Sequence, residues 1–107
     1  MKTLKFADDL VALILSGEKT STWRLFDDKG LRVGDELSLV KKSTGIQFAL
    51  ARIVGVKEKK LGEVDENDFN GQEKFENKEA MLQIYRKYYG DEVDWNVSVK
   101  IIGFKLL

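Results

Sequence analysis

The alternation of apolar side chains along residues 36–56 places the strongest constraint on how this chain folds. Leu37 and Leu39 share one face of the first run, at residues 36–41, and the turn Ser43-Thr44-Gly45 separates it from a second alternating run at residues 46–56. This pattern predicts two antiparallel strands joined as a hairpin. Both sets of side chains in the second run are apolar to some degree, so we expect both faces to be partly covered, as in a small barrel.

Two amphipathic segments predict helices beside this sheet. In the first, Asp8 or Asp9 caps a helix that runs to about Ser16, and Gly17 follows its end. The apolar pattern makes this helix largely buried. The residues expected on its inner side are Leu10, Val11, Leu13, Ile14 and Leu15.

The second predicted helix begins after Asn77, a good capping residue, and covers residues 78–88, with Gly90 near its end. A short helical turn is expected earlier, at residues 61–64. The residues expected on the inner side of the second helix are Ala80, Met81, Ile84, Tyr85 and Tyr88.

Two more strands are predicted, at residues 21–25 and about 95–106, with a bulge at Gly103 in the last, and residues 3–6 fit either a short strand or an entry segment. Together with the hairpin they amount to about five strands, which we expect to close into a small mixed barrel with two helices outside it. A chain of 107 residues fits one domain. The sequence therefore predicts a single α+β domain spanning residues 1–107.

Composition narrows the possible chemistry. The chain contains no His and no Cys, which excludes imidazole and thiolate metal sites, and we expect no metal and no cofactor. Only a site with oxygen ligands for Mg²⁺ or Ca²⁺ stays possible, and its one candidate, the acidic run at residues 65–68, fits a solvated turn better because it lacks the EF-hand spacing. The 18 basic and 18 acidic residues balance, which argues against strong non-specific binding to nucleic acid. No apolar run is long enough to span a membrane, so we expect a cytoplasmic protein without a membrane partner.

Residues 17–24, Gly-Glu-Lys-Thr-Ser-Thr-Trp-Arg, bring the chemically most capable side chains together. On a strand, Thr22 and Arg24 share one face, and Lys19 in the preceding turn can reach the same side. A threonine hydroxyl needs a nearby base to act as a nucleophile, and a lysine becomes a base when burial or a nearby cation lowers its pKa. The same run also fits a solvated turn in which Arg24 pairs with Asp27, Asp28 or Glu73.

This run, with Val33-Gly34-Asp35-Glu36-Leu37 ahead of the next strand, resembles the ASCH domains of the PUA-like superfamily. Their signature is Gly-x-Lys-Thr-x-Thr-x-Arg after a helix, and Glu73 is similar to an acidic residue that precedes their second helix. The resemblance implies a PUA-like barrel. It also implies two possible activities, which are distinguished below.

In the first, the resemblance is to small amidohydrolases that act on N4-acetylcytidine and related N4-acylated cytosines. It implies that Lys19 accepts a proton, Thr22 is the nucleophile and Glu73 donates a proton, with Thr20, Ser21 and Arg24 binding a pyrimidine nucleoside. No metal takes part. We expect a monomer.

In the second, the resemblance is to ASCH proteins that bind RNA, a few of which are ribonucleases. The basic residues Lys57, Lys59 and Lys60 would then contact RNA together with the same cleft. These lysines also fit the exposed end of a strand. Both activities stay open at this point.

Overall fold

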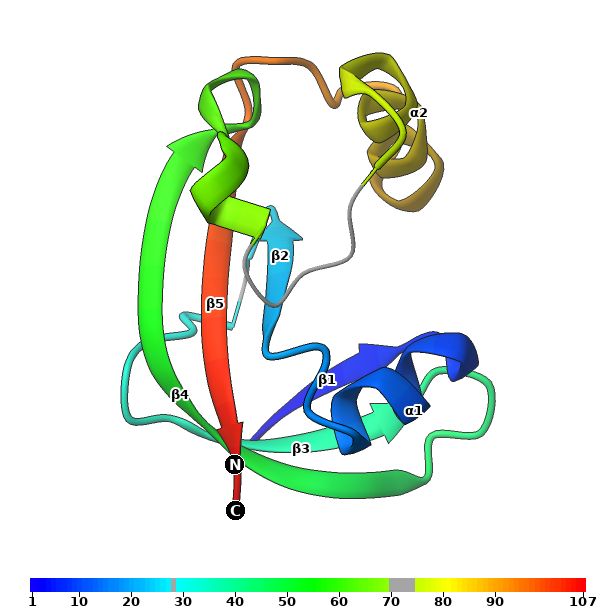
Figure 1. Cartoon of the computed structure of the whole chain (residues 1–107), viewed down its shortest axis with the longest axis vertical. Coiled ribbons are helices and arrows are strands. Elements are labelled where there is room, and N and C mark those ends of the chain that lie inside the picture. Colours follow the sequence, from blue (N-terminus) through cyan, green and yellow to red (C-terminus); the bar gives the residue numbers. More distant parts are fainter. Residues whose placement is uncertain (28, 70–74) are drawn as a thin grey trace.

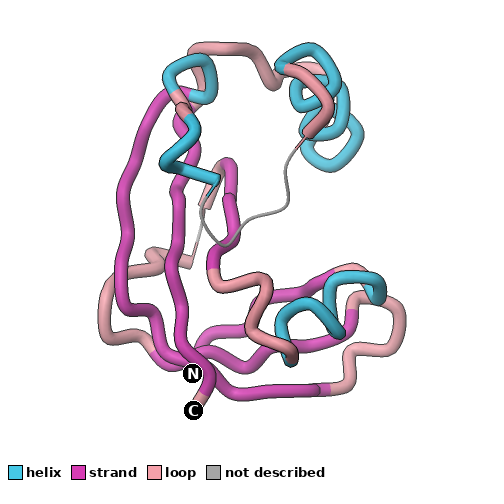
Figure 2. The backbone as a smooth tube through the Cα atoms, in the orientation of Figure 1, coloured by secondary structure: helices cyan, strands magenta, loops and turns pink. Residues whose placement is uncertain are grey.

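The computed structural model describes residues 1–27, 29–69 and 75–107. Its strands form one five-stranded sheet in the order β1-β3-β4-β5-β2. Figures 1 and 2 show that this sheet is strongly curled, with α1 and α2 lying apart at its two ends. The predicted α+β class and small curled barrel are confirmed. The elements in chain order are β1 (Lys2–Phe6), α1 (Asp8–Leu15), β2 (Ser21–Leu25), β3 (Glu36–Lys41), β4 (Gln47–Lys60), the 3₁₀ turns η1 (Leu61–Glu63) and η2 (Glu66–Phe69), α2 (Lys78–Tyr89) and β5 (Ser98–Leu106).

The edges of the sheet are β1 and β2, so the curled sheet is a half-barrel that opens between these two strands. β3 and β4 form the predicted antiparallel hairpin, and β4 continues by antiparallel pairing with β5. β1 pairs with β3 in parallel, whereas β2 pairs with β5 in the antiparallel sense. The first two strands of the chain are therefore brought to opposite edges of one sheet.

A bulge lies in β4 where its partner is Gly103. The register shifts between Ile53 and Gly55, so Val54 is the extra residue, and the predicted irregularity belongs to β4 rather than to β5. Ala51 and Ile53 point into the core, whereas Val54 remains 57% exposed. Both faces of the strand are partly covered, as expected, since Phe48 and Val56 are half-buried, but the cover does not reach Val54 or Ile46, which precedes β4 and is 65% exposed.

The helix α1 begins at Asp8, so its N-cap lies before both expected capping residues. Its N-cap is Ala7, which has no capping side chain, and Asp8 and Asp9 lie in the first turn, where their charge suits the helix dipole. Leu15 is 53% exposed, so the prediction that it is buried is wrong. Gly17 follows the end of the helix in the left-handed region, with φ +84°, as predicted.

The helix α2 begins as predicted, because the Asn77 side chain accepts a hydrogen bond from the Ala80 N–H at 2.8 Å. Its buried side chains are Met81, Leu82 and Tyr85. Two residues predicted to face inward are exposed instead, Ile84 at 37% and Tyr88 at 61%. The rotation of the helix therefore places Tyr88 at the surface.

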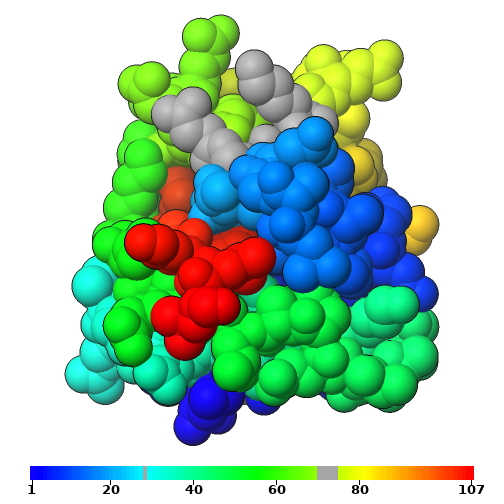
Figure 3. Space-filling model, turned by 60° about the horizontal axis from the view of Figure 1, so that its bottom comes forward, coloured from blue at the N-terminus to red at the C-terminus, as the bar shows by residue number. Residues whose placement is uncertain are grey.

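The C-terminal residues lie beside the segment that follows α1 and beside the β3–β4 hairpin (Figure 3). The Phe104 N–H donates to the Thr20 carbonyl at 3.0 Å, and this hydrogen bond holds that segment against β5.

Two clusters of buried side chains form the core. One cluster consists of Leu4, Phe6, Ile14, Leu31, Leu37, Leu39, Ala51, Ile53, Ile102 and Phe104, and the other of Trp23, Leu25, Leu61, Val64, Met81, Leu82, Tyr85, Val93, Val99 and Ile101.

Because the consecutive residues Ile101 and Ile102 enter different clusters, β5 is covered on both faces. The strand β5 begins at Ser98 and not at Trp95, where the sequence pattern placed its start, because the chain turns at Asp94. The Asp94 side chain accepts a hydrogen bond from the Asn96 N–H at 2.8 Å. Within the described ranges, the helices are too short or too polar to cross a membrane.

Candidate functional site

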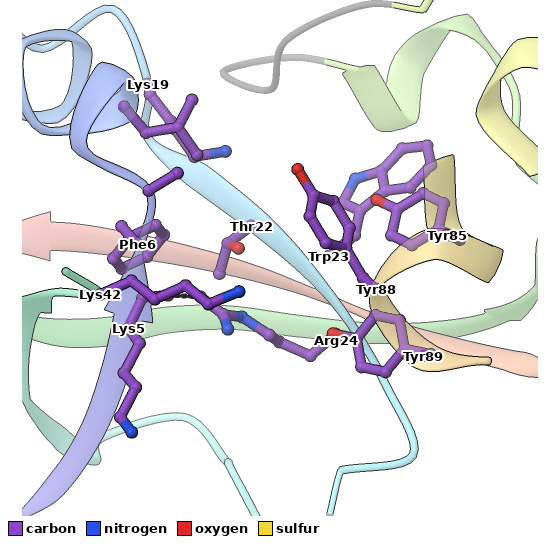
Figure 4. A pocket seen from close by; sticks show the side chains of 12 residues that line it. Lys5, Phe6, Lys19, Thr22, Trp23, Arg24, Lys42, Tyr85, Tyr88 and Tyr89 are labelled. Atoms are coloured by element: carbon purple, nitrogen blue, oxygen red, sulfur yellow. Dashed lines mark hydrogen bonds between the residues drawn. The ribbon is translucent and has the colours of Figure 1, made fainter. Parts of the chain in front are cut away.

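A cavity of about 280 Å³ lies where the half-barrel opens between β1 and β2 (Figure 4). Its walls come from the end of β1, the start of α1, β2, α2 and the residue after β3. It therefore joins the two core clusters at the edges of the sheet. The described residues that line it are Lys5, Phe6, Ala7, Leu10, Lys19, Thr22, Trp23, Arg24, Lys42, Tyr85, Tyr88 and Tyr89.

Lys19 places an amine in this cavity although the residue is only 3% exposed. The turn after α1 holds it in place, because the Lys19 N–H donates to the Leu13 carbonyl at 3.0 Å. Its Nζ donates to the Ser21 carbonyl at 2.8 Å. Lysines are seldom buried to this extent, since removing an ammonium group from water is costly. The fold thus maintains a buried amine at the wall of a cavity.

Thr22 lies in β2, directly opposite Ile102 of β5, and is 5% exposed. Thr22 and Lys19 are both among the side chains that line the cavity (Figure 4). The alternation of the strand turns Ser21 away from them, and Thr20 is exposed. Thr20 and Ser21 are not among the described lining residues; they contribute backbone carbonyls to the structure around the site.

Arg24 connects the two edge strands across the opening. Its Nη2 donates to the Lys5 carbonyl of β1 at 3.1 Å, and its guanidinium carbon lies 4.9 Å from the centre of the Phe6 ring. Asp27, considered from the sequence as a partner for Arg24, forms an ion pair with Lys100 at 2.8 Å. Burial raises the pKa of Asp27, but hydrogen bonds from Lys100 and from backbone N–H groups outweigh it and leave the pKa lowered.

Tyrosines of α2 form the facing wall. Tyr85 stacks on Trp23 with ring centres 6.2 Å apart and an angle of 9°, and Tyr89 continues the stack at 6.2 Å and 20°. Tyr88 stands at the mouth, where the Lys42 Nζ lies 5.8 Å from its ring centre. Aromatic faces of this kind suit a planar heterocycle. Sequence reasoning missed Lys42 and placed Tyr88 in the core, although three tyrosines at one end of a helix could have indicated an aromatic wall.

The lysines proposed from the sequence to contact RNA lie elsewhere. Lys57 and Lys59 form ion pairs with Asp68, the latter at 2.9 Å, whereas Lys60 is exposed. The three lysines are outside the described lining of the cavity. Glu73, the expected proton donor, lies outside the described residues.

In the acidic run at residues 65–68, the first three residues are exposed, as expected of a solvated turn, but Asp68 is only 2% exposed. Its carboxylate also accepts from the Asp65 N–H at 2.8 Å. Burial raises the pKa of Asp68, but hydrogen bonds from Lys57, Lys59 and the Asp65 N–H outweigh it and lower the pKa to about 2. The Trp23 indole N–H donates to the Asp68 carbonyl at 3.3 Å, which links this ion-pair cluster to the cavity wall.

Several solved proteins have a similar architecture. No protein-family model matches the chain, and no curated protein matches it in sequence. Among solved structures, a protein of the DUF984 family model from Enterococcus faecalis V583 superposes with a TM-score of 0.76 at 16% identity, covering 92% of this chain and 70% of the other.

Two ASCH proteins superpose in the same way. The ASCH domain from Lactobacillus crispatus JV V101 gives a TM-score of 0.71 at 18% identity, over 98% of this chain and 79% of the other. ASCH from Zymomonas mobilis gives 0.69 at 12% identity, over 96% of this chain and 65% of the other. At these identities the likeness concerns the fold. The curled five-stranded sheet with its two helices is the fold of the ASCH domains.

Proposed function

We propose that this protein is an amidohydrolase that removes the acyl group from an N4-acylated cytosine nucleoside, such as N4-acetylcytidine, using side chains rather than a metal. The observation that carries the proposal is that the buried Lys19 amine and the Thr22 hydroxyl share one cavity (Figure 4). A buried amine beside a hydroxyl is an arrangement that suits nucleophilic catalysis. The ASCH-like signature at residues 17–24 supports the same assignment.

In the proposed reaction, Thr22 Oγ attacks the acyl carbonyl carbon while its proton passes to Lys19 Nζ. The bond between the acyl carbon and the exocyclic nitrogen then breaks, and the leaving amine takes a proton from Glu73. Water hydrolyses the ester left on Thr22 and releases the carboxylic acid. A lysine can accept the proton only when neutral, and burial favours the neutral form of an amine. The Arg24 cation in the same wall favours it further.

The size and lining of the cavity support a small pyrimidine ligand. At about 280 Å³ it is close to the lower end of small-molecule pockets, which span roughly 300–1,000 Å³. The exposed ring of Tyr88 at the mouth offers a face for a planar base, and a stacked base contributes about 1–3 kcal/mol. Thr22 and Lys19 supply the polar groups that would act on the amide.

The direct test is to incubate the purified protein, in the presence of EDTA, with N4-acetylcytidine and to measure cytidine and acetate. Thr22→Ala and Lys19→Ala should each lower kcat/KM by about 100-fold or more, the usual range for loss of a nucleophile or base. Thr3→Ala, which removes an exposed hydroxyl on β1, is the matched control and should retain wild-type activity. Circular dichroism and a thermal melt establish that each variant is folded. Absence of cytidine at high enzyme concentration would reject the proposal.

An RNA-binding module is the second candidate function. The observation that favours it is the presence of cations and aromatic rings at the cavity mouth. This function receives less support from Lys57 and Lys59, whose charge is partly neutralised by Asp68. Titration with a labelled single-stranded RNA at increasing salt tests it, because phosphate contacts weaken as salt rises. Lys60→Glu should weaken such binding further if this patch takes part, and binding that ignores both salt and this substitution would exclude the patch.

A further inference from the structure

We propose that Lys42 forms a phosphate-binding subsite at the mouth of the cavity, so that the preferred ligand is a cytosine nucleotide rather than the bare nucleoside. The inference rests on the proposed function for the identity of the base. The phosphate contact can be tested independently of the reaction. The inference extends the proposed function by naming the class of substrate.

The backbone fixes Lys42 beside the end of β1. Its N–H donates to the Phe6 carbonyl at 2.8 Å, directly after the parallel β1–β3 ladder ends at the pair Phe6 and Lys41. The residue is exposed, and Figure 4 shows its side chain extended across the cavity toward Arg24 and Tyr88. The amine lies 5.8 Å from the Tyr88 ring centre. A rigid backbone thus carries a solvent-accessible cation over the opening.

Among the residues that the structure describes, the charge around this opening is one-sided, although the chain as a whole is neutral. Lys5, Lys19, Arg24 and Lys42 line the cavity, and the described lining residues include no carboxylate. Within the described ranges Lys42 forms no ion pair, and the nearby Asp8 carboxylate accepts from the Ser43 hydroxyl at 2.8 Å. A cation left without a carboxylate partner at the mouth of a cleft attracts an anionic ligand, and phosphate oxygens accept strong charge-assisted hydrogen bonds from lysine.

The shape of a cytosine nucleotide fits this placement. The exocyclic N4 and the ribose-bearing N1 lie on opposite sides of the pyrimidine ring. If the N4-acyl group reaches Lys19 and Thr22, the ribose points back toward the mouth. Its 5′ oxygen then leaves the cavity on the side where Lys42 and Tyr88 stand. The phosphate attached to that oxygen is the group that Lys42 would contact.

Isothermal titration with the unreactive products cytidine and cytidine 5′-monophosphate measures the contact. We expect the wild-type protein to bind the nucleotide about 3- to 10-fold more tightly than the nucleoside, as for one exposed charge-assisted contact. Lys42→Gln should bring this ratio close to one. Lys41→Gln, the matched control one residue earlier, should retain it. A short oligonucleotide with a central cytidine serves as a third ligand, since tighter binding that also depends on Lys42 would identify the phosphate as part of a chain.

Equal affinities for cytidine and its 5′-monophosphate in the wild-type protein would overturn the inference. So would a preference that survives Lys42→Gln, or absence of binding by both ligands. The two proposals fail separately. A preference for the nucleotide without deacylation of N4-acetylcytidine would support the phosphate subsite and reject the hydrolase. Deacylation without a preference for the nucleotide would support the hydrolase and reject the phosphate subsite.

Discussion

Replacing Asp68 with asparagine tests how the segment after β4 is held against the wall of the cavity. The Asp68 carboxylate is buried and meets two lysines of β4, and its backbone carbonyl accepts from the Trp23 indole N–H. Asp68→Asn keeps the size of the side chain but removes the charge. Lys57 and Lys59 then face each other without an anion between them, so the variant should be less stable.

The size of the loss follows from the pKa of Asp68. Its fall from 3.8 to about 2 corresponds to roughly 2.4 kcal/mol at about 1.36 kcal/mol per pH unit. The Lys57 and Lys59 side chains are 49% and 28% exposed, so solvent screens part of the attraction. We therefore expect the substitution to lower the free energy of unfolding by about 1.5–2 kcal/mol at pH 7.

The pH dependence gives the sharper test. Because the pKa is lower in the folded state, the unfolded chain binds more protons between pH 4 and pH 2. The stabilisation is complete above the unfolded pKa of 3.8 and is lost as the pH falls toward 2. The difference between wild type and Asp68→Asn should accordingly shrink over this range. Urea unfolding followed by tryptophan fluorescence measures it, since Trp23 is buried beside Asp68.

The matched control is Asp65→Asn, because the Asp65 side chain is 56% exposed and lies 3.3 Å from the same Lys59. Its effect should stay below about 0.5 kcal/mol, as for a surface pair. A loss below about 0.5 kcal/mol for Asp68→Asn at pH 7 would refute the reasoning, since it would fall within the range of surface substitutions. A larger loss that stays the same at pH 3 would show that size or hydrogen bonding, and not charge, holds the segment.

Three further predictions concern local features. Gly17→Ala should cost about 1–2 kcal/mol in thermal or urea unfolding, because φ is +84° there, and it should lower turnover by moving Lys19; full retention of both would contradict the assigned turn. Asn77→Ala should cost about 1 kcal/mol through loss of the helix cap, whereas Asn77→Ser should largely preserve stability in the same urea titration. Asp27→Asn should destabilise the protein at pH 7 and progressively less below the ordinary carboxyl pKa, since the pKa of Asp27 is lowered in the folded state; a pH-independent loss would exclude the charge as its cause.

Local patterns sufficed to predict the elements that have strong alternation and clear turns. The strands at residues 21–25 and 36–41 were predicted with the bounds that the structure shows. The parallel pairing of β1 with β3 had no local signature, since register between distant strands depends on packing. The last strand was predicted too long because the hydrogen bond from Asn96 N–H to Asp94 ends the alternating run in a turn.

For the site, the spacing within one short strand was informative. Thr22 and Arg24 line one cavity, as expected from alternation along the strand, although Trp23 between them also contributes to its wall, and the long side chain of Lys19 reaches it from the preceding turn. Lys42 was not predicted because it enters the cavity through the β1–β3 pairing. Asp68 was misread as solvated, although Lys57 and Lys59 at a spacing of two could have indicated a shared anion.

The pairing of β2 with β5 has a consequence for when the cavity can form during synthesis. Lys19, Thr22 and Arg24 are translated well before β5, yet β2 is an edge strand whose neighbour is β5, with Thr22 opposite Ile102 and Arg24 opposite Lys100. Closing a loop that spans most of the chain is slow compared with forming a local hairpin. A nascent polypeptide therefore carries these groups in an unassembled form until translation reaches the end of the final strand. Premature termination before residue 98 would leave the cavity unassembled, even though every residue of its described lining had been made.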